Sequence, residues 1–315
     1  MQENAVRLFI KVRNFSSASV AAAIFLSVLF SGFLGKETMG WQIALAIFAL
    51  AIGIPHGALD HLITLPKNEP KKMAIFIAIY VAVAIIAVIG ILKFNIVGFI
   101  LVLLMSAVHF GIGDTAFINE IDKRSASRAK LLRSAYIPAA GFTPVFIPLV
   151  NSASTDALAK VNPSLINWHQ GLDQEILTVV TSFAVISIVV LLITRRVREA
   201  IDLTLLLALA LITPPLIAFA VYFGCWHAMR HTARLTLILP KAIAAASEGE
   251  PKKSFFAAVI PGLPALIGTV VVAAVIAITD SNLDASYLWY LLVVVWALTV
   301  PHMIVTSKID QKSLS

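Results

Sequence analysis

Long apolar runs alternate with short charged segments along the whole chain. The runs cover 17–35, 41–65, 73–92, 95–118, 131–151, 175–193, 201–240, 255–279 and 287–305. About 18 or more consecutive apolar residues suffice to cross about 30 Å of hydrocarbon as an α-helix. No segment shows the alternation of apolar and polar positions that marks the strands of an outer-membrane barrel. The pattern therefore predicts an all-α fold, a polytopic transmembrane helical bundle.

The run 201–240 is too long for one membrane span, and Pro214 and Pro215 interrupt it. Two adjacent prolines remove two backbone donors and disfavour helix at Thr213, so the chain either kinks or turns back at this point. A turn gives ten crossings and a kink gives nine. We therefore expect about 8–10 spans.

The positions of Lys and Arg favour the turn. With a turn at Pro214, nineteen of the 24 basic residues lie on one side of the membrane, with Arg230 and Arg234 also near that face, and only Lys36, Lys93 and Lys160 lie on the other. Cytoplasmic loops carry such an excess, so both termini are expected in the cytoplasm of a multi-pass protein of the cell inner membrane. The net charge of +7 then reflects topology, and no nucleic-acid partner is expected.

Composition adds to this description. Of the 315 residues, 59% are hydrophobic and 13% are charged, whereas soluble domains carry about 25% charged residues. The single cysteine, Cys225, excludes an intrachain disulfide framework and a CxxC metal site. We expect one integral membrane domain over 1–315, with 1–16 as a cytoplasmic N-terminal segment and 306–315 as a C-terminal tail.

Six of the seven histidines lie in or at the ends of apolar runs, where polar side chains are costly and usually functional. Five of them lie on predicted spans that run inward from the outer face: His56, His109, His227, His231 and His302. Each is 11–15 residues from the outer end of its span, or about 16–23 Å deep at 1.5 Å per residue. A common depth on helices of the same polarity suggests a common site.

His227 and His231 are four residues apart, so both imidazoles can reach one metal ion from one helix face. The spacing alone fits a purely structural pair equally well. Taken singly, His56, His109 and His302 fit hydrogen-bonded histidines between helices equally well.

Other polar and aromatic residues complete the candidate site. Asp60 and Asp114 follow a histidine by four or five residues, and each is a candidate acceptor for the second N–H of a metal-bound imidazole. The alternative is that they cap the helix ends or pair with basic residues there. His61 and His302 are candidates for an extra ligand or a hydrogen-bond partner. Three aromatic residues are candidates to line an apolar substrate tunnel, although ordinary packing explains them as well: Phe110, Tyr222 and Trp226.

Neutral imidazoles without a thiolate suit iron, zinc or copper. A closed tetrahedral zinc site would be structural, whereas Fe(II) with four histidine ligands keeps up to two positions for O2 and substrate. A membrane di-iron site typically needs about eight histidines with an HxxHH box, which this chain lacks. A haem would need only two axial histidines and would leave the others unexplained.

Four short motifs follow one another along most of the chain. They are Pro55-His56-Gly57-Ala58-Leu59-Asp60, His109-Phe110-Gly111-Ile112-Gly113-Asp114, His227-Ala228-Met229-Arg230-His231 and Pro301-His302. In these motifs, their order and their spacing, the chain resembles the Brp/Blh-type bacterial and archaeal β-carotene 15,15′-dioxygenases. By motif, the resemblance implies that the iron ligands are His56, His109, His227 and His231.

The resemblance also implies the reaction and the partners. The expected cofactor is Fe(2+), and the expected substrates are β-carotene and O2. Cleavage of the central 15,15′ double bond would give two molecules of all-trans-retinal, which would supply a microbial rhodopsin. Such a substrate dissolves in the lipid bilayer, so a metal ion at membrane depth suits it. The main alternative is a transporter in which the histidines carry protons or a transported metal, and a third possibility is a purely structural metal scaffold.

Overall fold

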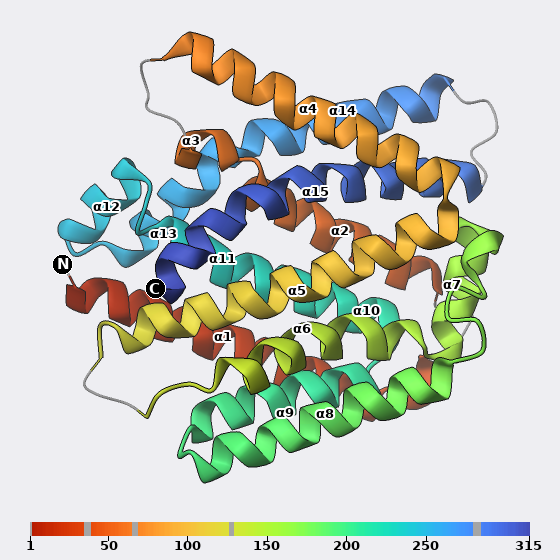
Figure 1. Cartoon of the computed structure of the whole chain (residues 1–315), viewed down its shortest axis with the longest axis horizontal. Helices are drawn as coiled ribbons and strands as arrows, with labels where there is room; N and C mark the ends of the chain where they lie inside the picture. The colour runs from red at the N-terminus through yellow and green to blue at the C-terminus, as the bar shows by residue number, and fades with distance from the viewer. Residues whose placement is uncertain (1, 35–38, 65–68, 126–128, 280–284) are drawn as a thin grey trace.

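The structure is a computed structural model of the chain and describes residues 2–34, 39–64, 69–125, 129–279 and 285–315 (Figure 1). All regular elements in these ranges are helical. In chain order, they are α1 (Gln2–Leu29), η1 (Ser31–Phe33), α2 (Met39–Gly57), α3 (Asp60–Thr64), α4 (Pro70–Lys93), α5 (Asn95–Asp122), α6 (Arg133–Leu149), α7 (Ser152–Val161), η3 (Pro163–Leu165), α8 (Asp173–Ile193), α9 (Val197–Ile212), α10 (Pro215–Ala220), η4 (Val221–Ala228), α11 (Met229–Leu235), α12 (Pro240–Ser247), α13 (Pro251–Val259), η5 (Ile260–Gly262), α14 (Leu263–Thr279) and α15 (Ala285–Leu314).

The predicted class, an all-helical membrane protein, is confirmed. Within the described ranges, seven helical segments are long and apolar enough to cross a membrane: Asn4–Leu29, Gly40–Thr64, Pro70–Lys93, Asn95–Asp122, Asp173–Ile193, Pro251–Val271 and Trp289–Leu314. Helices α6, α9 and the α10–α11 segment are shorter and run among these long helices (Figure 1). The side of the membrane on which each terminus lies remains a prediction.

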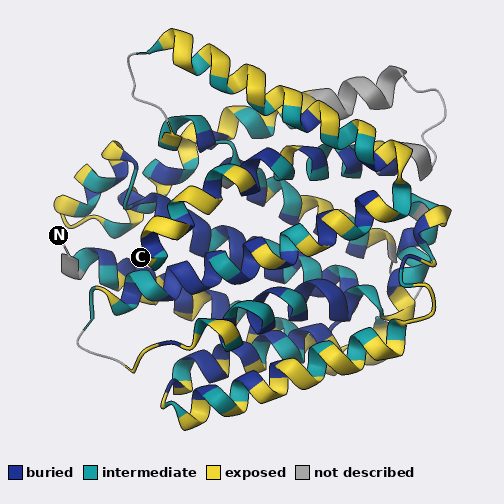
Figure 2. Cartoon of the chain, viewed as in Figure 1, coloured by how far each residue is buried: buried dark blue, intermediate teal, exposed yellow. Residues whose placement is uncertain are grey.

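Apolar side chains cover the outside of the bundle as well as its inside. Exposed residues follow α4 and α8 at two opposite edges, and buried residues concentrate on α5 and α6 between them (Figure 2). On α4 only Ala84 and Ile91 are buried, and its exposed residues include Ile75, Ile79 and Ile86. A large exposed apolar surface is expected where the surroundings are lipid, because lipid imposes no penalty on apolar side chains.

The chain turns back at Pro214, as predicted. Thr213 and Pro214 have extended backbone conformations, with ψ of 141° and 137°, and separate α9 from α10. Asp202 before the turn and Arg230 after it form an ion pair with an N–O distance of 3.3 Å. In one continuous helix these two residues would be about 42 Å apart. The ion pair therefore requires a hairpin.

Both ends of the chain are helical and packed. Residues 1–16 were expected to form a cytoplasmic N-terminal segment. From residue 2 on, they form the first half of α1, where the ring of Phe9 stacks on that of Phe117 with 5.0 Å between centroids. The expected tail 306–315 is the end of α15, and Thr306 and Asp310 are buried there. Both ends thus contribute to the bundle.

Helices α5 and α6 approach closely at a pair of glycines. A methyl group on Gly111 would collide with the carbonyl oxygen of Ile137, and one on Gly141 would collide with that of Ala107. Small residues allow such backbone contact between membrane helices. The contact fixes α5, which carries His109, against the centre of the bundle.

Replacing Gly111 by alanine is therefore expected to destabilise the protein by about 1–3 kcal/mol, because backbone atoms cannot yield as a flexible side chain can. The matched control is Gly113→Ala on the same helix, where an added methyl group meets no atom within 4 Å. The measurement is the thermal unfolding midpoint of each detergent-solubilised variant. Equal midpoints for the two variants would contradict the packing described.

Candidate functional site

Four buried histidines lie together in the middle of the bundle. They are His109 on α5, His227 at the end of η4, His231 on α11 and His302 on α15. The ring centroid of His109 is 5.2 Å from that of His227, 6.4 Å from His231 and 5.4 Å from His302. The His231 ring is 6.2 Å from His227 and 5.6 Å from His302. Of the five histidines predicted to lie at a similar depth, these four therefore form one cluster.

The backbone at His227 is unusual. Residues Val221–Ala228 form a π-helix, in which hydrogen bonds run from i to i+5 and the turn is widened. Phe223 lies on the same segment and stacks on the His227 ring at 5.8 Å and 26°. A side chain on Gly53 of α2 would collide with the Phe223 ring. The glycine on α2 thus leaves room for the aromatic ring that holds His227.

His109 is oriented by a hydroxyl group from another helix. Its Nδ1 lies 3.4 Å from Oγ1 of Thr306 on α15. The single proton of that hydroxyl is directed to backbone carbonyls one turn earlier, with 3.0 Å to the His302 oxygen. With the hydroxyl proton given to these carbonyls, the oxygen accepts from Nδ1–H of His109, and in this tautomer the lone pair lies on Nε2. This is the form in which an imidazole binds a metal ion through Nε2.

His302 is oriented by a carboxylate. Its Nδ1 lies 3.0 Å from Oδ2 of Asp60, and the Tyr80 hydroxyl donates to the same oxygen at 3.1 Å. Asp60 was predicted to accept an N–H from a site histidine, and the histidine that it contacts is 242 residues away along the chain. As with His109, a proton on Nδ1 leaves the Nε2 lone pair on the opposite side of the ring.

Asp114 takes part in a different interaction. It accepts from Nη1 of Arg230 at 2.6 Å and from the Tyr136 hydroxyl at 2.7 Å. This matches the alternative that Asp114 pairs with a basic residue. Because Arg230 lies between His227 and His231 in the chain, the ion pair joins the helix that carries them to α5.

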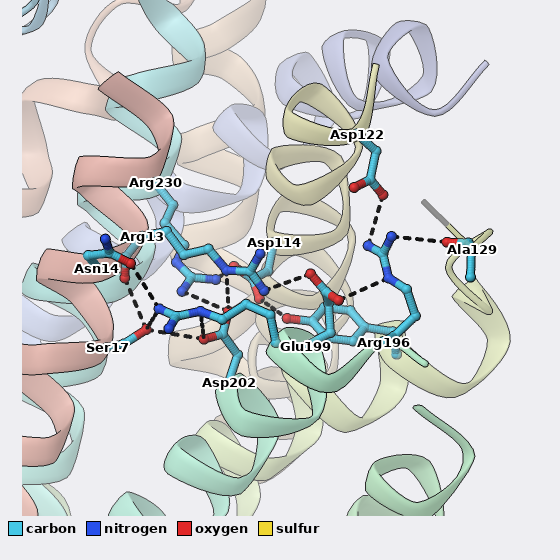
Figure 3. A network of polar contacts seen from close by, with 12 residues as sticks. Arg13, Asn14, Ser17, Asp114, Asp122, Ala129, Arg196, Glu199, Asp202 and Arg230 are labelled. Atoms are coloured by element: carbon cyan, nitrogen blue, oxygen red, sulfur yellow. Dashed lines mark hydrogen bonds and ion pairs between the residues drawn. The ribbon is translucent and has the colours of Figure 1, made fainter. Parts of the chain in front are cut away.

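The ion pair belongs to a larger buried network (Figure 3). Asp202 on α9 binds both Arg230 and Arg13, the latter with 2.9 Å between Nε and Oδ2. Glu199, one turn earlier, binds Arg13 at 2.7 Å and Arg196 at 2.9 Å. The guanidinium of Arg230 also stacks on the Trp226 ring, 3.5 Å from its centroid. Charges buried in a low-dielectric interior need such partners.

A cavity of about 370 Å³ reaches the histidines. His109, His227 and His302 line one part of it together with Asp60. The remaining lining is mostly apolar and comes from α2, α4, α14 and α15: Leu50, Ile54, Phe76, Ile77, Val81, Ala265, Val295 and Leu298. Helix α4, which lines this cavity through Phe76 and Val81, also carries most of its apolar side chains exposed on the outside of the bundle.

The other predicted site residues lie around the cluster. His61 lines the large cavity, and its Nδ1 is 3.1 Å from the carbonyl oxygen of Ala58. Phe110 lines the same cavity, with its ring 4.4 Å from that of His227. Tyr222 and Trp226 line a separate cavity of about 10 Å³ beside Arg230. Of the three predicted tunnel residues, Phe110 is thus the one on the large cavity.

The side chain of His56 lies outside the described part of the structure, so its predicted role is not tested. Its backbone is in α2, and the next residue, Gly57, faces the site: a methyl group there would lie 3.4 Å from Nδ1 of His302. The backbone next to His56 therefore passes beside His302.

A group of four buried imidazoles is a donor set of a kind suited to iron, zinc or copper. With a metal–nitrogen distance of about 2.1 Å, ring centroids lie about 3.2 Å from the ion, so two bound imidazoles are about 4.5–6.4 Å apart. Each of the five separations given above lies within this range when taken singly, but no single point lies about 3.2 Å from all four centroids at these separations. Among the described residues, no three His, Cys, Asp or Glu side chains are already close enough to form a metal site. The rings would have to move closer to a common point to bind one ion.

Several residues that shape the site were not predicted from the sequence. Thr306 contacts His109, and Tyr80 donates to Asp60, the partner of His302. Asp202 pairs with Arg230, and Arg13 pairs in turn with Asp202. A detectable signal existed for Asp202, because an ionisable residue in a membrane run usually marks a functional or paired position. The sequence does not single out Thr306 or Tyr80, since Thr and Tyr are common in membrane helices.

The described part of the chain thus forms an all-helical membrane protein with a buried histidine cluster at an apolar cavity. The family model of the β-carotene 15,15′-dioxygenases matches residues 47–310, and the chain belongs to this family. A relative from an uncultured marine bacterium, 66A03, named β-carotene 15,15′-dioxygenase, is 29% identical over 212 residues, which cover 63% of this chain and 70% of the relative. No solved structure matches this chain.

Proposed function

We propose that the protein cleaves the central 15,15′ double bond of β-carotene with O2 and forms two molecules of all-trans-retinal. The observation that carries the proposal is the group of buried imidazoles at the end of a large apolar cavity, in a chain of this family. We assign the iron ligands to four histidines: His56, His109, His227 and His231. The site would lie in the cell inner membrane, and the retinal would serve a microbial rhodopsin.

The protein's part in this reaction is to bind and to orient. The apolar walls of the cavity take up a rigid hydrocarbon and exclude water. Thr306 fixes the ring of His109, and the stacked Phe223 fixes that of His227. When bound, Fe(II) supplies the redox chemistry that lets O2 react with an electron-rich double bond.

The balance of the reaction makes few demands on side chains. One double bond of the substrate and the O–O bond break, two carbonyl groups form, and both oxygen atoms enter the products. No external reductant is consumed, and no proton has to be moved by an acid or a base. This fits a site whose described lining is mostly apolar and whose carboxylate, Asp60, is engaged by His302 and Tyr80.

Co-expression in a β-carotene-producing bacterium tests the proposal. The wild-type protein is expected to bleach the orange cells and to accumulate retinal, measured by chromatography. His109→Ala should reduce retinal at least about 100-fold, because the loss of a ligand affects every step that needs the metal. The control is His169→Ala, in the segment between η3 and α8 and outside the cluster. Orange cells with inserted, iron-loaded wild-type protein, or full retinal formation by His109→Ala, would contradict the proposal.

A further inference from the structure

His302 is placed and supported like the proposed iron ligands, although the four-histidine assignment leaves it out. Its side chain is buried, and its ring centroid is 5.4 Å from that of His109 and 5.6 Å from that of His231. These distances are as short as those among the proposed ligands themselves, at 5.2–6.4 Å. By position alone, His302 is therefore as good a candidate for a ligand as His109, His227 and His231.

The partners of His302 are those of a metal-binding histidine. Asp60 lies 3.0 Å from Nδ1, and a carboxylate there fixes the tautomer and the ring orientation and increases the basicity of Nε2. Tyr80 donates to the same Asp60 oxygen at 3.1 Å and so fixes the carboxylate in turn. Gly57 leaves room for the imidazole, since a methyl group would lie 3.4 Å from Nδ1. Three elements, α2, α3 and α4, thus position one ring of α15.

We propose that His302 is a fifth imidazole ligand of the metal ion, and that Asp60 and Tyr80 are its positioning residues. The inference rests on the proposed iron site and deepens it. An ion with six positions would then keep one position for a small ligand, where four histidines would leave two. The hydrocarbon substrate would be held by the cavity walls and not by the metal.

The first test is iron affinity, measured by competition with a chelator on purified, detergent-solubilised protein. His302→Ala is expected to weaken iron binding at least about 10-fold, and Asp60→Asn by about 10–100-fold, the usual effect of changing the partner of a ligating histidine. The matched control is His61→Ala, which lines the same cavity but contacts the Ala58 carbonyl, and which should leave iron affinity unchanged. If His302→Ala does not fold, His302→Gln and Asp60→Asn provide the comparison.

The second test separates a ligand from a merely structural histidine. The iron pre-edge intensity in X-ray absorption rises when a coordination position is lost, so it should rise in His302→Ala and stay constant in His61→Ala. A structural role would lower the unfolding midpoint and leave this intensity unchanged. If the wild-type protein binds iron and forms retinal, but His302→Ala keeps its iron affinity and intensity, this inference alone is overturned. If the wild-type protein binds no iron, the proposed iron site fails with it.

Discussion

Replacement of Arg230 by methionine is expected to abolish retinal formation and to destabilise the protein by about 3–5 kcal/mol, the usual cost of breaking a buried ion pair. Arg230 is 2% exposed and binds both Asp114 and Asp202. Without Arg230, Asp114 loses the cation of this ion pair and keeps the hydrogen bond that it accepts from the Tyr136 hydroxyl. Asp202 is affected less, since Arg13 still binds it.

The effect on activity follows from the position of Arg230. It lies between two proposed ligands, His227 and His231, and binds the helix that carries a third, His109. Loss of the ion pair frees the α11 segment to shift against α5. Because a displacement of about 1 Å can cost about 100-fold in rate, a small shift is enough to inactivate a site of this kind.

A charge-matched variant makes this prediction specific. Arg230→Met combined with Asp114→Asn removes both charges and should recover part of the lost stability, as shown by a higher unfolding midpoint than that of Arg230→Met alone. The control is Lys253→Met, whose ion pairs with Glu248 and Glu250 are solvent-exposed and contribute little to stability. A single variant that unfolds at the wild-type temperature and forms normal amounts of retinal would contradict the role given to the network.

The grouping of the histidines could be predicted because helix geometry fixes depth. Once the apolar runs and the turn at Pro214 are known, a residue's distance from the end of its span gives its height in the membrane. His109, His227, His231 and His302 have similar heights, and the structure brings them together. Depth says nothing about which partner each ring selects, so the contact of Asp60 with His302 required the three-dimensional structure.

The buried charges illustrate a second limit of the sequence. Arg13 and Arg196 look like ordinary basic residues at the ends of apolar runs and were counted with the residues of the basic side. In the structure both are almost fully buried and bind acids on α5 or α9. Their burial depends on Glu199 and Asp202, which are distant in sequence from Arg13. A count of charges along a chain contains no information on such pairing.

The π-helix at His227 is a third feature that the sequence does not reveal. Residues Val221–Ala228 contain no proline, and Gly224 alone does not predict a widened turn. The i, i+4 spacing of His227 and His231 correctly predicts neighbouring rings, with 6.2 Å between centroids. This segment packs against α1 and α2, contacts that exist only in the tertiary structure.

Removal of the metal is the second prediction with a large expected effect. Protein stripped of iron by a chelator should form no retinal, because no described side chain can replace the metal in a reaction of O2 with a double bond. Fe(II) should restore activity to the stripped wild-type protein. Zn(II) should bind the same imidazoles without restoring activity, since it has no redox chemistry.

The most direct test of the central claim is retinal formation by purified protein with β-carotene under O2, measured before chelation, after chelation and after addition of Fe(II) or Zn(II). We predict about one iron per chain, two molecules of retinal per β-carotene consumed, loss of activity on chelation and recovery with Fe(II) alone. Full retinal formation by metal-free protein, or equal recovery with Zn(II), would contradict the assignment of a histidine-bound iron site.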